Sequence, residues 1–156
     1  MKYTSKVNPI LSIDDESSIP PTETERPYIL VVDDDQSILS MLISLLESEG
    51  YSCVGFSESQ LILPFLQEMG KRGVRHLPAL LLLDLMMPVV SGYDIARWLS
   101  EHEPYHHIPI LVITADARVR DKSDIPGAED ILLKPFQIDD LITKVEHYLL
   151  PLPGGS

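Results

Sequence analysis

Residues that can take part in metal or phosphoryl chemistry follow directly after four apolar runs of this chain. Asp33 and Asp34 follow YILVV, Asp84 follows ALLLL, Thr114 follows IPILVI, and Lys134 follows DILL. Carboxylate oxygens are ligands for hard divalent cations, and hydroxyl and ammonium groups bind phosphate. These side chains can act together only if the chain folds so that distant positions meet.

The apolar runs are typical of buried strands, and helical patterns separate them. Strands are expected at 28–32, 51–56, 79–83, 108–113 and 130–133, and helices near 36–49, 58–70, 91–101 and 137–149. The stretch 115–130 is polar and is interrupted by Pro126 and Gly127, so we expect at most one short helix there. The alternation predicts an α/β fold with a doubly wound, five-stranded parallel sheet and right-handed crossovers.

In such a sheet the carboxyl ends of the strands lie at one edge, where ligands bind. We therefore expect three carboxylates, a hydroxyl and an ammonium in one pocket. Neighbouring carboxylates repel one another by roughly 4 kcal/mol per pair at an effective dielectric near 20. Lys134 offsets one charge, and Mg²⁺, which prefers carboxylate, water and phosphate oxygens, suits the remainder. An aspartate beside Mg²⁺ and a lysine is equipped to accept a phosphoryl group.

The double aspartate occurs twice, in ILSIDDESSI (10–19) and ILVVDDDQSI (29–38). Only the second copy leads into an amphipathic helix, because the prolines of PPTETERP follow the first. We interpret the first copy as fortuitous or as a weak docking segment. The composition predicts a flexible, acidic, Pro- and Ser-rich arm over 1–26, a domain over 27–150 and a flexible tail over 151–156.

Composition argues against several function classes. The net charge is −12 and no basic run is present, which disfavours nucleic-acid binding and attachment to anionic membranes. We see no secretory signal and no run of about 18 apolar residues that could span a membrane. Cys53 is expected to be a buried core residue, in a protein of a reducing, cytoplasmic compartment. We interpret His102, His106 and His107 as part of a solvated connection, because their spacing lacks a regular zinc-ligand frame.

Four motifs together resemble the receiver domain of bacterial two-component response regulators. They are ILVVDDD, LLLLDLMMP with Gly92 after it, LVITA and LLKPF, in order over nearly all of 28–149. The resemblance implies the flavodoxin-like (βα)5 receiver fold with strand order 2-1-3-4-5. It also implies that a histidine kinase or phosphotransfer protein is the phosphoryl donor.

The resemblance also assigns roles to residues. Asp33 and Asp34 match the acidic pair that holds Mg²⁺, Asp84 matches the phosphoacceptor and a metal ligand, and the backbone carbonyl of Met86 matches a further ligand. Asp35 falls outside the pair and is expected to cap the first helix.

In the same resemblance, Thr114 matches the hydroxyl that turns toward the phosphoryl group, and Lys134 matches the lysine that pairs with it. The Lys134–Pro135 bond is expected to be cis. Two features depart from the family pattern. Ile131 stands where the family usually has the aromatic ring that reports phosphorylation, and the segment from Thr114 to Lys134 is short.

Three functions stay open at this point. The leading hypothesis is a phosphoryl-accepting module, not an enzyme. Because no output domain follows, its expected output is binding to a downstream protein or onward phosphotransfer. The second is a phosphatase of the haloacid-dehalogenase type with Asp33 as nucleophile, in which Thr114, Lys134 and Asp139-Asp140 would supply the later motifs. The third is a receiver-like scaffold that binds partners without phosphorylation.

Overall fold

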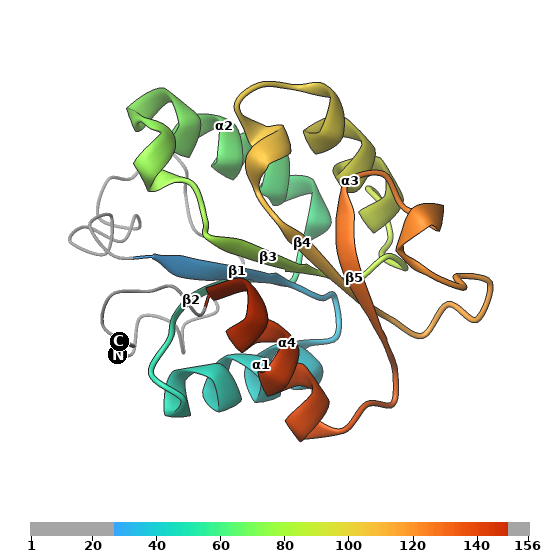
Figure 1. Cartoon of the computed structure of the whole chain (residues 1–156). Coiled ribbons are helices and arrows are strands. Elements are labelled where there is room, and N and C mark those ends of the chain that lie inside the picture. Colours follow the sequence, from blue (N-terminus) through green and yellow to red (C-terminus); the bar gives the residue numbers. More distant parts are fainter. Residues whose placement is uncertain (1–26, 150–156) are drawn as a thin grey trace.

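The computed structural model describes residues 27–149 as one parallel sheet between two layers of helices (Figure 1). The strands are β1 (Tyr28–Val32), β2 (Ser52–Phe56), β3 (Leu80–Leu83), β4 (Ile110–Thr114) and β5 (Ala128–Leu133), and the helices are α1 (Gln36–Ser48), α2 (Ile62–Arg72), α3 (Gly92–Glu101) and α4 (Ile138–Leu149). All strand pairs are parallel, in the order β2-β1-β3-β4-β5. The predicted flavodoxin-like fold is confirmed, whereas the proposed arm over 1–26 and tail over 151–156 lie outside the described residues.

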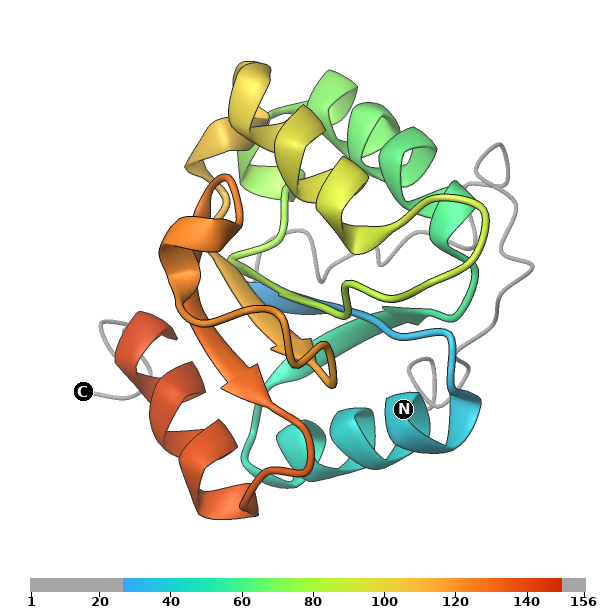
Figure 2. The same cartoon turned by 90° about the vertical axis from the view of Figure 1, so that its right-hand side faces the viewer.

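Each face of the sheet has its own hydrophobic core because the strands are buried on both sides. In β1, Leu30 and Val32 face the layer of α2 and α3, while Ile29 and Val31 face the layer of α1 and α4. The view in Figure 2 shows the two helix layers on opposite sides of the sheet. Each strand therefore needs a continuous apolar run, since alternation with polar residues would place polar side chains in one of the two cores.

The capping interaction predicted for Asp35 is confirmed at the start of α1. Its side chain accepts hydrogen bonds from the backbone N–H groups of Ser37 (2.9 Å) and Ile38 (3.2 Å). The chain turns sharply after the helix at Gly50, which has a φ of 97°. The Asp35 cap fixes the position at which the chain leaves β1 and enters α1.

Element boundaries differ from the predicted ones by about two residues in the second half of the sheet. β4 begins at Ile110 and β5 begins at Ala128, which pairs with Ile110 beside an irregularity of the register. Between β4 and β5 every residue is described, and the only helical turn there is a short 3-10 turn, Lys122–Asp124. The predicted lack of a full helix in this segment is confirmed. Among residues 27–149, no helix combines the length and apolar character needed to cross a bilayer.

Truncating Leu42 should destabilise the fold much more than truncating Met41 beside it. Leu42 is 1% exposed in the core between α1 and the sheet, whereas Met41 is 40% exposed. We expect Leu42→Ala to lower the free energy of unfolding by about 2–5 kcal/mol, because it removes buried contacts and leaves a cavity. Met41→Ala should lower it by less than about 0.5 kcal/mol. Urea denaturation measures both, and equal effects would contradict the placement of α1.

Candidate functional site

Three carboxylates lie together at the carboxyl edge of β1 and β3. The parallel register pairs Val32 with Leu83, so Asp33 and Asp84, which follow them, lie side by side. Both are buried, at 1% and 5% exposure, while Asp34 is exposed. Ligand oxygens of Asp33, Asp34 and Asp84 all lie within 4.8 Å of one another. The structure thus brings Asp84 together with two carboxylates that lie 50 and 51 positions before it in the chain.

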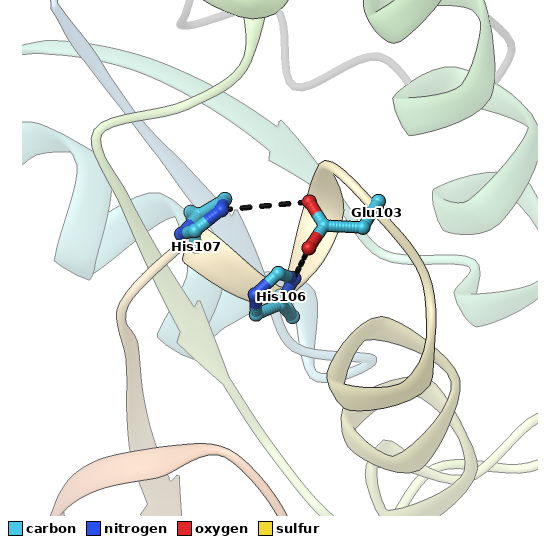
Figure 3. A group of neighbouring side chains, drawn as sticks. All are labelled: Glu103, His106 and His107. Carbon is cyan, nitrogen blue, oxygen red and sulfur yellow. Dashed lines mark ion pairs between the residues drawn. The ribbon is translucent and has the colours of Figure 1, made fainter.

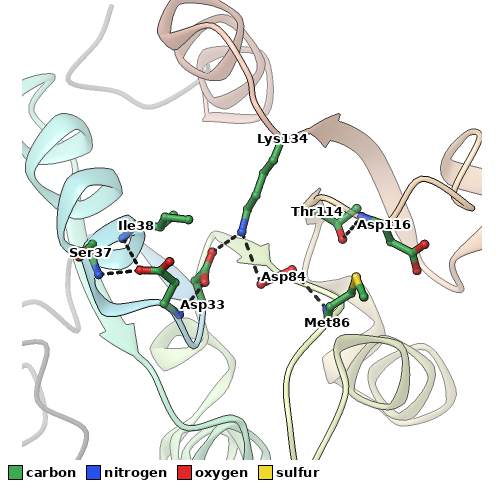
Figure 4. Close-up of polar contacts among 9 residues, drawn as sticks. Asp33, Ser37, Ile38, Asp84, Met86, Thr114, Asp116 and Lys134 are labelled. Carbon is green, nitrogen blue, oxygen red and sulfur yellow. Dashed lines mark hydrogen bonds and ion pairs between the residues drawn. The ribbon is translucent and has the colours of Figure 1, made fainter.

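Lys134 reaches these carboxylates from the end of β5, as Figure 4 shows. Its Nζ lies 2.8 Å from Asp33 Oδ2 and 3.5 Å from Asp84 Oδ2, and its backbone N–H donates to the carbonyl of Thr114 (2.8 Å). The Lys134–Pro135 bond is cis, as the resemblance implied. The ammonium therefore lies between the two buried carboxylates.

Burial and neighbouring charges shift the pKa values of Asp84 and Lys134. Burial, followed by the charge of Asp33, raises the pKa of Asp84 above its ordinary value, against the opposing effects of Lys134 and the Met86 N–H. For Lys134, burial acts to lower the pKa, but its interactions with Asp33 and then Asp84 outweigh burial, so the pKa is raised. One ammonium does not fully compensate the carboxylates, and the cluster favours a further positive charge.

The donor set fits Mg²⁺, which prefers hard oxygen ligands together with water. Asp34 is exposed, and one of its carboxylate oxygens lies within 4.8 Å of an oxygen of Asp84. Asp33 also accepts hydrogen bonds from Lys134 and, through Oδ1, from the Asp35 N–H (2.9 Å). Met86 follows Asp84 in the same loop, and its N–H donates to Asp84 Oδ1 (3.2 Å). That the backbone carbonyl of Met86 is a metal ligand stays a prediction.

Thr114 is fully buried at the end of β4. Its hydroxyl accepts a hydrogen bond from the backbone N–H of Asp116 (3.1 Å), and none of the hydrogen bonds found over residues 27–149 joins it to Asp84. In Figure 4, Thr114 at the end of β4 and Asp116 in the loop after it lie on the side of Asp84 away from Asp33. Thr114 is thus beside the cluster but is engaged with its own loop.

Sequence reasoning missed a second polar group beside this site. Asp116 is 4% exposed and accepts from the Tyr93 hydroxyl (2.6 Å) and from the Arg118 guanidinium, with Nε 2.9 Å from Oδ1 and Nη2 2.8 Å from Oδ2. The hydrogen bonds of Arg118, then that of Tyr93, hold the pKa of Asp116 well below its usual range. Asp116-x-Arg118 was visible in the sequence, but nothing in the pattern connected it with Tyr93.

The position that departs from the family pattern is structurally ordinary. Ile131 lies in β5 opposite Val112 and packs, partly buried, against the core on the α2 and α3 side. An isoleucine has no hydroxyl and no ring, so it offers neither the polar contact nor the large rotation of an aromatic residue.

The histidine-rich loop separates into two parts. His102 stacks on Trp98 with ring centroids 4.0 Å apart, and its Nδ1 lies 2.7 Å from the Trp98 carbonyl oxygen. His106 Nδ1 and His107 Nε2 lie 3.2 Å and 3.5 Å from the two carboxylate oxygens of Glu103 (Figure 3). All three members of this second group are exposed, and a single carboxylate is shared by both rings, which is an arrangement of surface ion pairs.

The phosphatase hypothesis also requires Asp139 and Asp140, which are not part of the cluster of Asp33, Asp34 and Asp84. Asp139 and Asp140 are exposed in the first turn of α4. Asp33, the required nucleophile, is engaged by Lys134 and by the Asp35 N–H.

Comparisons with known proteins agree with this geometry. The model of the response regulator receiver domain matches residues 29–146. The polar-differentiation response regulator DivK of Brucella ovis is 28% identical over 123 residues, which cover 78% of this chain and 94% of that protein. The structure of a response regulator receiver protein from Burkholderia phymatum has a TM-score of 0.67 at 30% identity and covers 81% of this chain and 100% of its own.

A further structure carries a ligand. The response regulator TrrA from Thermotoga maritima, solved in complex with Mg²⁺ and BeF, has a TM-score of 0.64 at 28% identity and covers 79% of this chain and 99% of its own. The family match extends over most of the chain and includes every strand end that carries the site. This chain therefore belongs to the response regulator receiver domain family of two-component systems.

Proposed function

We propose that this chain accepts a phosphoryl group on Asp84, with Mg²⁺, from a histidine kinase or phosphotransfer protein and signals by binding another protein. The observation that carries the proposal is the cluster in which Asp33, Asp34 and Asp84 oxygens lie within 4.8 Å and Lys134 approaches two of them. TrrA, crystallised with Mg²⁺ and BeF, supports the same ligand chemistry for this site.

Asp84 is suited to act as the nucleophile. Its carboxylate oxygen would form a bond to phosphorus while the bond from phosphorus to the donor nitrogen breaks, and the electron pair leaves with that nitrogen. The Met86 N–H and the Lys134 ammonium contact different oxygens of Asp84 and orient the carboxylate. Asp33 and Asp34 would hold Mg²⁺, which when bound neutralises charge on the transferred oxygens.

The product adds a charge of about −1.5 to −2 to the pocket. Lys134 would then pair with phosphoryl oxygens, and the Thr114 hydroxyl would turn toward them, which moves the surface around the loops. The exposed faces of α1 and α4 are the candidate docking surfaces for the donor and the downstream protein. We expect a cytoplasmic protein.

Incubation with acetyl phosphate tests the proposal directly. With Mg²⁺ present we expect the protein to be labelled on Asp84, as mapped by mass spectrometry, and with excess EDTA we expect labelling to disappear. Label on Asp33 with rapid turnover would instead support the phosphatase. Absence of label, together with partner binding that is unaffected by Asp84→Asn, would leave the scaffold.

A further inference from the structure

We infer that Tyr93, Asp116 and Arg118 form a clasp. It holds Thr114 in the position that this residue has in the unphosphorylated protein, and it opens when Asp84 is phosphorylated. These three are positioning residues, because they act on the site through Thr114 rather than on the phosphoryl group itself. The inference rests on the proposed function, and it supplies the switch that Ile131 cannot provide.

The clasp is connected to Thr114 by a hydrogen bond within the loop after β4. The hydroxyl of buried Thr114 accepts from the Asp116 N–H (3.1 Å), and the Asp116 carboxylate is held by the Tyr93 hydroxyl and the Arg118 guanidinium. Arg118 also donates its backbone N–H to Asp116 Oδ1 (3.0 Å). Thr114 can therefore move toward Asp84 only if Asp116 moves with it or if the hydrogen bond between the Asp116 N–H and the Thr114 hydroxyl breaks.

Tyr93 connects the same clasp to the loop that carries Asp84. It follows Gly92, whose N–H donates to the carbonyl of Leu85 (2.9 Å). A Cβ at Gly92 would overlap the carbonyl oxygen of Asp84 and lie 2.6 Å from the Cα of Leu85. The start of α3 thus packs directly on the backbone of the phosphoacceptor loop, and the Tyr93 hydroxyl ties this loop to the one after Thr114.

The burial of the members makes the clasp capable of opening. Asp116 is 4% exposed, whereas the side chain of Arg118, which contacts it, is 79% exposed. When the loop moves, the guanidinium exchanges the carboxylate for water and the Asp116 carboxylate becomes hydrated, so that hydration recovers part of the lost interaction. The segment between Thr114 and β5 contains no α-helix that would resist this motion. Two arrangements of the loop can therefore be close in free energy.

Beryllofluoride, a phosphoryl mimic, provides the test on the full chain with Mg²⁺. We expect Tyr93→Phe to bind beryllofluoride on the order of tenfold more tightly than the protein without substitutions. The variant loses the hydrogen bond from the Tyr93 hydroxyl to the Asp116 carboxylate, which favours the closed clasp. Arg118→Ala should shift the affinity in the same direction. In the unmodified protein, beryllofluoride should speed amide exchange over residues 115–121, and in Tyr93→Phe this exchange should already be fast without it.

Matched variants separate the clasp from general destabilisation. Tyr148→Phe removes a hydroxyl that donates to the Glu129 carbonyl, and Arg120→Ala removes an exposed arginine of the same loop. Neither should change beryllofluoride affinity. A merely structural role for Tyr93 predicts weaker binding with a lower melting temperature, and unchanged or weaker binding in Tyr93→Phe overturns the clasp. If the unmodified protein is not labelled on Asp84 by acetyl phosphate, the proposed function itself fails, which distinguishes the two failures.

Discussion

Replacing Asp84 with asparagine is expected to abolish labelling by acetyl phosphate. The amide keeps the shape of the side chain and its place beside Lys134, but it removes the nucleophilic oxygen on which the transfer depends. We expect the labelling rate to fall by at least about a hundredfold, to the level of the background. Mass spectrometry of the protein after incubation with Mg²⁺ and acetyl phosphate measures the loss.

Asp35 offers a matched control for this substitution. It belongs to the same acidic run, but its carboxylate caps α1 through the Ser37 and Ile38 N–H groups. Asparagine caps helices about as well as aspartate, so Asp35→Asn should leave both stability and labelling nearly unchanged. Label that persists at full rate in Asp84→Asn, above all if it is found on Asp33, would show that Asp84 is not the acceptor.

The sheet and the cluster were predictable because both depend on short-range patterns. Apolar runs such as YILVV specify strands that are buried on two faces, and parallel pairing places Asp33, Asp84 and Lys134 at one edge whatever the details of the connecting loops. The order of the strands came from the resemblance rather than from periodicity. The roles of these residues in phosphorylation stay predictions.

The clasp around Asp116 was not predictable because it depends on loop geometry. Tyr93 and Asp116 are 23 positions apart and belong to different connections, so no periodic pattern relates them. The boundary of β5 was placed two residues late for a similar reason. Ala128 and Glu129 do not look like strand residues. Ala128 pairs with Ile110 of β4, and Glu129 lies at the register irregularity that follows this pair.

Replacing Lys134 with methionine should destabilise the protein strongly when no divalent cation is present. Lys134 is the nearest cation to two buried carboxylates, 2.8 Å from Asp33 and 3.5 Å from Asp84. Removal of one partner from a buried ion pair leaves uncompensated charge and lowers the free energy of unfolding by about 3–5 kcal/mol. Urea denaturation in EDTA measures this loss, and Mg²⁺ should restore part of it because it supplies positive charge to the same oxygens.

Lys144 is the control because its ion pair has the same length in a different environment. Its Nζ lies 2.8 Å from Asp130 Oδ2, with side-chain exposures of 30% and 36%, whereas Lys134 and Asp33 have 17% and 2%. Lys144→Met should therefore lower the free energy of unfolding by less than about 1 kcal/mol, without a response to Mg²⁺. Equal losses in the two variants would mean that the Lys134 ammonium does not compensate the buried carboxylates. A loss at Lys134 that Mg²⁺ leaves unchanged would mean that the cation does not bind at this edge of the sheet.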